Sequence, residues 1–164
     1  MDDALRHCIE TREAVLGDPR HGLSQKPFRF VSRITPLINV DLLIQDDRSQ
    51  TLLTWRDDEF FGPGWHVSGG IIRYKESADR IRVCARAELG ADVSFEPVPL
   101  LVLEDIGGQN TRDHISLLFR CRVLSPPDEA KRAASDPPSS GQWRWHDRCP
   151  PDLLEAQRPY ARFF

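Results

Sequence analysis

The sequence lacks the features that mark several large classes of protein. No apolar run approaches the roughly 20 residues that a membrane-spanning helix requires, and the acidic start at Met1-Asp2-Asp3 is unlike the positive end of a signal peptide. Basic residues are not in excess, since 22 Lys and Arg face 25 Asp and Glu, for a formal net charge of -3. Binding to a nucleic-acid backbone needs a clustered basic surface. We therefore expect a cytoplasmic protein that binds neither membrane nor nucleic acid.

Cysteine spacing excludes two further classes. The four cysteines, Cys8, Cys84, Cys121 and Cys149, lie far apart and form no C-x-x-C pair. The sequence therefore predicts neither a zinc ribbon nor a disulfide framework. Of the 164 residues, 40% are hydrophobic and 29% are charged, which suits one globular domain with a buried core and a small-molecule ligand.

Hydrophobic periodicity predicts a mixture of helices and strands. Helical spacing is expected over 4–16, ending at Gly17-Asp18-Pro19, and over 77–89, ending before Gly90. Apolar, β-branched runs predict strands, and the turn at 46–49 predicts that the first two of them form a hairpin. These strands are expected at 37–44, 51–56, 98–103 and 114–124. The order of elements predicts a mixed α/β or α+β sandwich.

The two ends of the chain and one internal segment differ from this pattern. Residues 1–26 are expected to form an N-terminal helical extension, and 27–164 the main domain. Residues 125–141 hold four prolines among charged and serine residues, which predicts a mobile loop. Trp143-Arg144-Trp145 resumes a strand, and the tail begins with a short helix near 152–156.

The most informative stretch runs from a double glycine through the following helix. Gly69-Gly70 is followed by Glu76, and the helix closes with Glu88-Leu89-Gly90. This arrangement resembles the Nudix box, G-x(5)-E-x(7)-R-E-U-x-E-E-x-G-U, in which U is apolar. Gly70, Glu76 and Gly90 match structural positions of the box, and Glu88 matches a metal-binding glutamate. The helix is one residue shorter than the pattern, and Val83, Cys84 and Ala87 stand in place of its Arg, Glu and Glu.

The wider sequence is similar to one branch of that superfamily, the GDP-mannose mannosyl hydrolases, which also keep the E-L-G glutamate and lose most of the others. Matching segments run in the same order from about Pro27 to Trp145, and include 35–37, 41–42, 52–56, 64–70, 75–76 and 143–145. The resemblance implies a Nudix α/β/α sandwich with a mixed β-sheet, and a homodimer. It also implies one Mg²⁺, or Mn²⁺ in its place, on the carbonyl of Gly69 and the carboxylate of Glu88.

Roles for several polar residues follow from the same resemblance. Arg56 matches an arginine that neutralises the departing diphosphate, and Asp41 matches an aspartate near the substrate. Ile71 stands where the branch has a second arginine, so we expect Arg73, two places further along an extended strand, to take that role. A metal ion and arginines would together stabilise charge that grows on the leaving group.

One pair of functional residues in the branch is missing here. Its Gln-His pair, which binds metal and serves as general base, falls on Ser139 and Ser140. Gln142 is the nearest replacement for the metal-binding glutamine, and His114 and His146 are alternative bases.

Three functions are compatible with these residues. The first is Mg²⁺-dependent hydrolysis of a nucleoside diphosphate sugar, with water attacking the sugar carbon so that the nucleoside diphosphate leaves whole. The second is cleavage of a phosphoanhydride bond in another nucleoside diphosphate derivative. The third is a Nudix-like module that binds a nucleotide or a protein partner without turnover. We expect the first.

Overall fold

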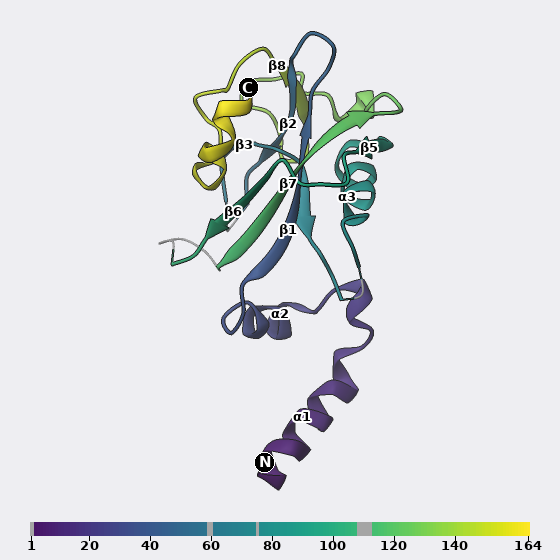
Figure 1. The fold of residues 1–164 in the computed structure, drawn as a ribbon, viewed down its shortest axis with the longest axis vertical. Coiled ribbons are helices and arrows are strands. Elements are labelled where there is room, and N and C mark those ends of the chain that lie inside the picture. Colours follow the sequence, from purple (N-terminus) through teal and green to yellow (C-terminus); the bar gives the residue numbers. More distant parts are fainter. Residues whose placement is uncertain (1, 59–60, 75, 108–112) are drawn as a thin grey trace.

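Two β-sheets form the centre of the described part of the chain, which comprises residues 2–58, 61–74, 76–107 and 113–164 of the computed structural model (Figure 1). The helices are α1 (Asp3–Leu16), α2 (Gln25–Val31) and α3 (Arg80–Leu89), with short 3₁₀ helices η1 (Pro19–His21), η2 (Glu129–Lys131) and η3 (Glu155–Phe163). The strands are β1 (Leu37–Ile44), β2 (Thr51–Arg56), β3 (Gly64–His66), β4 (Gly69–Ile71), β5 (Val93–Phe95), β6 (Leu101–Asp105), β7 (His114–Val123) and β8 (Trp143–His146).

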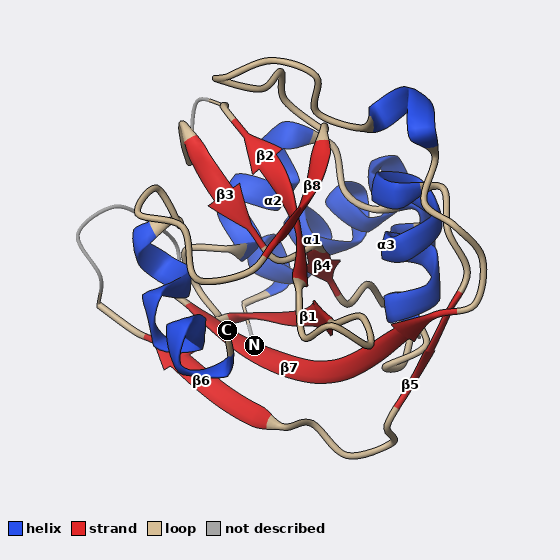
Figure 2. Ribbon diagram, turned by 90° about the horizontal axis from the view of Figure 1, so that it is seen from above, coloured by secondary structure: helices blue, strands red, loops and turns tan. Residues whose placement is uncertain are grey.

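The larger sheet is mixed, as the resemblance implies. Its strand order is β4-β1-β7-β5, and β6 also pairs with β7. β1 and β7 run parallel, from Leu37 opposite His114 to Ile44 opposite Cys121, while the other neighbours are antiparallel. The smaller sheet, β3-β2-β8, is antiparallel. α3 and η3 lie on opposite sides of the larger sheet (Figure 2), which confirms the layered α+β sandwich.

The predicted hairpin between 37–44 and 51–56 is wrong. Both segments are strands, but β1 belongs to the larger sheet and β2 to the smaller one. A single antiparallel bridge between Gln45 and Thr51 joins them at the turn. An apolar pattern shows only that a strand is buried. Strands of either sheet could bury it, so the pattern does not predict which strand pairs with it. From this turn the two strands enter different sheets, and the residues of the candidate site lie between those sheets.

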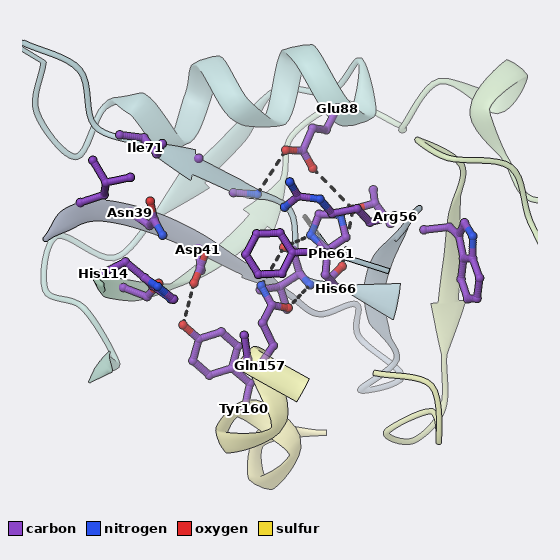
Figure 3. Close-up of a pocket in the computed structure, with 18 of the residues that line it drawn as sticks. Asn39, Asp41, Arg56, Phe61, His66, Ile71, Glu88, His114, Gln157 and Tyr160 are labelled. Atoms are coloured by element: carbon purple, nitrogen blue, oxygen red, sulfur yellow. Dashed lines mark hydrogen bonds between the residues drawn. The ribbon is translucent and has the colours of Figure 1, made fainter. Parts of the chain in front are cut away.

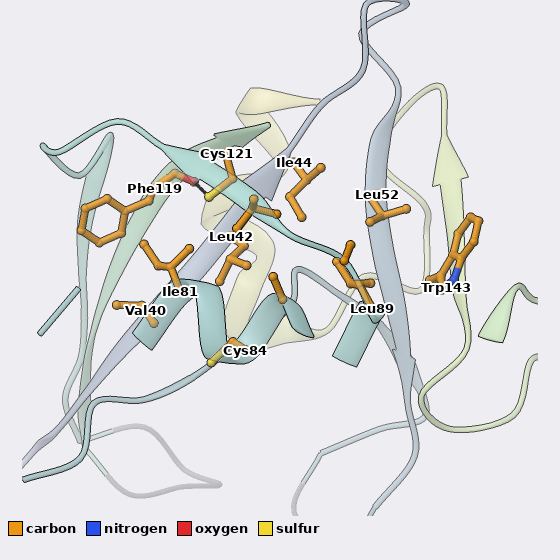
Figure 4. Close-up of a cluster of buried hydrophobic side chains, with 13 residues drawn as sticks. Val40, Leu42, Ile44, Leu52, Ile81, Cys84, Leu89, Phe119, Cys121 and Trp143 are labelled. Atoms are coloured by element: carbon orange, nitrogen blue, oxygen red, sulfur yellow. Dashed lines mark hydrogen bonds between the residues drawn. The ribbon is translucent and has the colours of Figure 1, made fainter. Parts of the chain in front are cut away.

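Two apolar clusters hold the layers together. In the first, Ile81, Ala85 and Leu89 of α3 pack on Val40 and Leu42 of β1, and these side chains are fully buried (Figure 4). The second lies between the sheets and η3, and contains Leu43, Leu53, Trp55, Trp65, Val67, Leu118, Leu153 and Tyr160. Burial of one such side chain stabilises the fold by about 1.5–3 kcal/mol. α3 confirms the predicted helix, although it begins at Arg80, after a turn over 77–79.

The segment 125–141, expected as a mobile loop, is held against the end of α3. The Asp128 N–H donates to the Leu89 carbonyl at 2.8 Å, and the Trp143 Nε1–H donates to the Asp128 carbonyl at 2.8 Å. The Lys131 ammonium donates to the carbonyls of Ala87 at 2.8 Å and Glu88 at 3.1 Å. These carbonyls belong to the last turn of a helix, where no partner exists within the helix itself. Polar contacts hold the segment in place. The prediction of a mobile loop considered only its low apolar content and did not include these contacts.

The N-terminal region is only partly separate from the sheets. α1 confirms the helix predicted over 4–16; it projects away from the sheets in Figure 1, and residues 2–13 are exposed. The expected boundary between 26 and 27 falls inside α2, whose Phe28 lines the cavity described below. The strand expected at 98–103 is observed as β6, which begins at Leu101, and the tail helix expected near 152–156 is observed as the 3₁₀ helix η3, which begins at Glu155. None of the described helices is long and apolar enough to span a membrane.

Replacing Lys131 with Met tests the cap on α3. We expect a loss of about 1 kcal/mol, because two carbonyls lose a charged donor at the negative end of the helix. This corresponds to a drop of roughly 2–4 °C in Tm for a domain of this size. Lys26→Met, at an exposed position in α2, is the matched control in the same thermal melts. Equal Tm values for the two variants would contradict the capping role.

Candidate active site

A cavity of about 860 Å³ lies between the two sheets (Figure 3). It is lined by side chains from β1, β2, β3, β4, β7, α3 and η3, and by Phe28 of α2. Of the residues that the sequence singles out, the cavity brings together Asp41, Arg56, Gly69, Gly70, Glu88 and His114.

The pairing of β4 with β1 determines what Gly69 presents to this cavity. The Leu42 N–H donates to the Ser68 carbonyl at 2.9 Å, and the Ile72 N–H donates to the Ile38 carbonyl at 2.8 Å. Since hydrogen-bonded and non-hydrogen-bonded pairs alternate along an antiparallel ladder, Gly69 and Asp41 form a non-hydrogen-bonded pair. The N–H and carbonyl of Gly69 therefore point away from β1, and the N–H donates to Glu88 Oε1 at 3.4 Å.

Glu88 lies in the last turn of α3 and reaches the cavity at the edge of β4. Its other donors are neutral hydroxyls: Thr54 Oγ1 lies 3.5 Å from Oε2, and Ser68 also hydrogen bonds to the carboxylate. Burial raises the pKa of Glu88 to about 7, and the charge of Asp41 adds to this, while the hydrogen bonds and the charge of Arg56 oppose it. A buried carboxylate with neutral donors is well suited to a hard cation, which favours oxygen ligands.

His66 is a fixed, neutral part of the cavity wall. Its Nδ1 lies 2.8 Å from the Val67 carbonyl, and its Nε2 lies 3.0 Å from Thr54 Oγ1. Burial lowers the pKa of His66 to about 4, so the imidazole is uncharged at neutral pH. The Trp-His-Val sequence carries no signal for this arrangement, because Thr54 becomes its partner only through the pairing of β2 with β3.

Arg56 lies at the end of β2, where the smaller sheet meets the cavity. Its guanidinium forms an ion pair with Asp58 and lies 4.5 Å from the centroid of the Phe61 ring. The Arg56 side chain is 36% exposed. Ion pairing and stacking on an aromatic face both restrict a guanidinium, whose planar donors match phosphate oxygens. Arg56 is therefore placed to contact an anionic ligand in the cavity.

Asp41 is buried on the cavity side of β1. Its Oδ2 accepts a hydrogen bond from Tyr160 Oη at 2.6 Å, and Ser116 of β7 also hydrogen bonds to it. Burial raises the pKa of Asp41 above its usual range, against the effect of these donors. Tyr160 was not expected at the site, because it follows Asp41 by 119 residues and sequence spacing gives no sign of the contact.

Arg73, Gln142 and His146 lie outside the residues that line the cavity. β4 ends at Ile71, and the Glu76 N–H donates to the Arg73 carbonyl in a turn. The side-chain alternation of an extended strand, on which the expectation for Arg73 depended, therefore stops before Arg73. The Arg73 guanidinium lies beside Gly22. Gln142 accepts a hydrogen bond from the Ser139 N–H at 2.9 Å. The His146 ring packs edge-on to Trp65, with centroids 4.5 Å apart.

The remaining residues of the box make structural contacts. Glu76 accepts a hydrogen bond from the Arg73 N–H at 2.8 Å and lies 3.4 Å from Arg80 Nη1. Gly90 has a φ of 64° and ends α3, as predicted. A Cβ on Gly70 would lie 2.9 Å from Cys84 Sγ, so the helix packs closely on the glycine. Lys75, part of the resemblance, lies outside the described residues.

Gly69→Ala tests the close contact between β4 and β1. The added Cβ would lie 2.5 Å from the Val40 carbonyl oxygen and nearer still to Asp41 Oδ1, so backbone must move. We expect a loss of stability of about 1–3 kcal/mol in chemical denaturation. Gly70→Ala, whose nearest neighbour is the Cys84 side chain, is expected to cost less. The reverse order would show that this contact does not limit the site.

Glu88→Gln tests the electrostatic cost of the buried carboxylate without metal. The folded pKa of about 7 exceeds the ordinary glutamate pKa of 4.5, so the folded state holds the proton more tightly and stability falls as pH rises from about 4.5 to 7. At roughly 1.4 kcal/mol per unit, the loss at pH 8 is on the order of 3 kcal/mol. We therefore expect Glu88→Gln, in EDTA, to melt above the wild type at pH 8 and to lack this pH dependence. A lower melting temperature at pH 8 would contradict the pKa assignment.

Comparison with known proteins shows the fold of the chain. No protein-family model matches the sequence, and no curated protein matches it. A solved MutT Nudix hydrolase from Burkholderia pseudomallei has 21% identity and a TM-score of 0.59, covering 78% of this chain and 97% of that chain. A Nudix hydrolase from Nitrosomonas europaea has 17% identity and a TM-score of 0.55, covering 68% of this chain and 72% of that one.

A third similar structure is a UDP-X diphosphatase, with 19% identity and a TM-score of 0.58, covering 96% of this chain and 77% of that chain. At these identities the likeness concerns fold and not activity. The chain therefore has the fold of the Nudix hydrolases, as the resemblance of its double glycine and following helix to the Nudix box implies.

Proposed function

We propose that this protein is a Mg²⁺-dependent hydrolase that splits a nucleoside diphosphate sugar into nucleoside diphosphate and sugar, with Mn²⁺ as a substitute for Mg²⁺. One observation carries the proposal. The buried carboxylate of Glu88 and the backbone of Gly69, which points away from β1, lie together on the wall of a cavity that also contains Arg56. This combination suits a cation and a diphosphate bound side by side.

Glu88 and Gly69 would hold the cation. The Glu88 carboxylate accepts hydrogen bonds from neutral groups, Gly69, Thr54 and Ser68, and the Gly69 carbonyl is outside the β1–β4 ladder, so both oxygens suit a hard ion. When bound, the cation supplies positive charge against the diphosphate leaving group. Gln142 lies outside the cavity lining, and we do not assign it to the metal.

Arg56 would neutralise the diphosphate together with the cation. Its guanidinium is already restrained by Asp58 and Phe61, so little freedom is lost when phosphate oxygens bind. Arg73 lies beside Gly22, outside the cavity lining, so we do not assign it a contact with the substrate. Charge on the leaving group would thus be balanced by one cation and one arginine.

His114 is the histidine that we propose as general base. It lines the cavity, and its Nδ1 lies 3.8 Å from Asp105 Oδ2, across the pairing of β7 with β6. A carboxylate beside an imidazole orients the ring. His146 packs on Trp65 outside the cavity lining, so we do not assign it this role. The proton of the attacking water would pass to His114 as the sugar–oxygen bond breaks.

The polar floor of the cavity favours a sugar as the group transferred to water. Asn39 and Asp41 of β1 lie beside Ser116 of β7 and offer amide, carboxylate and hydroxyl groups. Such groups match the alternating donors and acceptors of a sugar.

The homodimer and the cytoplasmic location remain predictions.

Two other functions remain as candidates. One solved structure with this fold is named a UDP-X diphosphatase, and the corresponding candidate is phosphoanhydride cleavage of a nucleoside diphosphate derivative. The replacement of box glutamates by Cys84 and Ala87, and the serines at 139 and 140, support a binding module without turnover.

The test is a turnover screen over nucleoside diphosphate sugars and other nucleoside diphosphate derivatives, with and without Mg²⁺. We expect release of nucleoside diphosphate from a sugar nucleotide, and a loss of at least 100-fold in Glu88→Gln, as for loss of a group that stabilises charge in the transition state. Glu10→Gln, at an exposed position in α1, is the matched control and should retain wild-type turnover.

Isotope labelling and binding together separate the three functions. In oxygen-18 water, label in the sugar shows attack at carbon, and label in phosphate shows attack at phosphorus. Binding of nucleotide sugars without turnover would favour the module. Turnover that is equal in wild type and Glu88→Gln would contradict the proposed metal site.

A further inference from the structure

The C-terminal segment covers the open edge of β3 and forms one wall of the cavity. The Trp65 N–H donates to the Asp152 carbonyl and the Leu154 N–H donates to the Trp65 carbonyl, both at 2.9 Å. At Val67, two residues after Trp65, the Gln157 side chain continues this pattern. The Val67 N–H donates to Gln157 Oε1 at 2.7 Å, and Gln157 Nε2 lies 3.5 Å from the Val67 carbonyl. The amide of Gln157 thus replaces a strand backbone, and fixes η3 against the site.

This attachment places Tyr160 over β1. Tyr160 is fully buried, and its hydroxyl donates to Asp41 Oδ2 at 2.6 Å (Figure 3). Ser116 hydrogen bonds to the same pair from β7. A carboxylate whose Oδ2 is held on one side cannot rotate freely, so the position of Oδ1 is fixed as well. That oxygen lies over Gly69, in the space that a Cβ on Gly69 would occupy.

The chemistry of Asp41 limits what it contacts in a ligand. An ionised carboxylate only accepts hydrogen bonds, and it repels a diphosphate. A hydroxyl group is therefore its suitable partner. We propose that Tyr160 is a positioning residue, which holds Asp41 so that Oδ1 accepts a hydrogen bond from a hydroxyl of the substrate's sugar. This inference rests on the proposed function, and it assigns the C-terminal segment a part in sugar recognition.

Tyr160→Phe tests the inference, because it retains the buried ring and removes only the hydroxyl. With GDP-mannose as first probe, or the sugar nucleotide that wild type turns over fastest, we expect KM to rise about tenfold and kcat to change less than threefold. The Kd for GDP, which has no sugar beyond the diphosphate, should stay within twofold of wild type. Tyr74→Phe is the matched control, since Tyr74 is the other tyrosine of the chain and is 59% exposed.

A double-mutant cycle shows whether Tyr160 acts through Asp41. Asp41→Ala removes the acceptor itself and should raise KM at least as much as Tyr160→Phe does. In the Asp41→Ala background, Tyr160→Phe should have no further effect on KM, because the group that it positions is gone. Additive effects of the two changes would overturn the inference, since Tyr160 would then act on its own or on the fold.

Other outcomes separate this inference from the proposed function. A wild-type KM in Tyr160→Phe, with turnover of the sugar nucleotide intact, overturns the inference alone. An equal loss of affinity for GDP and GDP-mannose would place the contact of Asp41 on the nucleoside, and also overturns it. Wild-type protein that binds GDP with Mg²⁺ but turns over no sugar nucleotide overturns the proposed function and, with it, the sugar contact.

Discussion

The pairing of β4 with β1 at Gly69 is the constraint on which the cavity depends. Because Gly69 and Asp41 form a non-hydrogen-bonded pair, the backbone of Gly69 faces outward toward Glu88. Its missing side chain leaves the space that Asp41 Oδ1 occupies. A shift of β4 by one residue along β1 would turn the Gly69 backbone into the ladder and away from Glu88, whereas the pairing of β1 with β7 would keep Asp41 on its own face. The contact between Gly69 and Glu88 would be lost.

The layered arrangement explains why Glu88 must reach around an edge. α3 packs on the face of the larger sheet that carries Val40 and Leu42, whereas Asp41 points to the opposite face. β4 is the edge strand nearest to α3, and its glycines allow the helix to approach closely. Lys131 and Asp128 hold the end of that helix in place. The position of one carboxylate thus depends on the edge strand and on the segment that follows β7.

The cavity contains an electrostatic conflict that a bound cation would relieve. Two buried carboxylates, Asp41 and Glu88, share the cavity wall, and burial raises the pKa of both. Their hydrogen bonds come from hydroxyls and a backbone N–H, which offset only part of the cost of desolvating a charge. Such a site sacrifices stability in the free protein, and the loss is recovered when a ligand brings positive charge.

The sequence by itself determined the positions of most helices and strands. It also determined the box residues, which lie close together in the chain. Apolar periodicity located β1, β2, β7 and α3, and the spacing of Gly69, Glu76 and Glu88 indicated the fold that the structure shows. These are local properties, since a helix or strand is specified by residues within a few positions of one another. Tertiary structure alone decided that β1 and β2 enter different sheets, that Arg73 lies outside the cavity lining, and that Tyr160 meets Asp41. Each of these depends on which strand or helix packs beside another. A side-chain pattern predicts that a residue is buried, but it does not predict which element buries it.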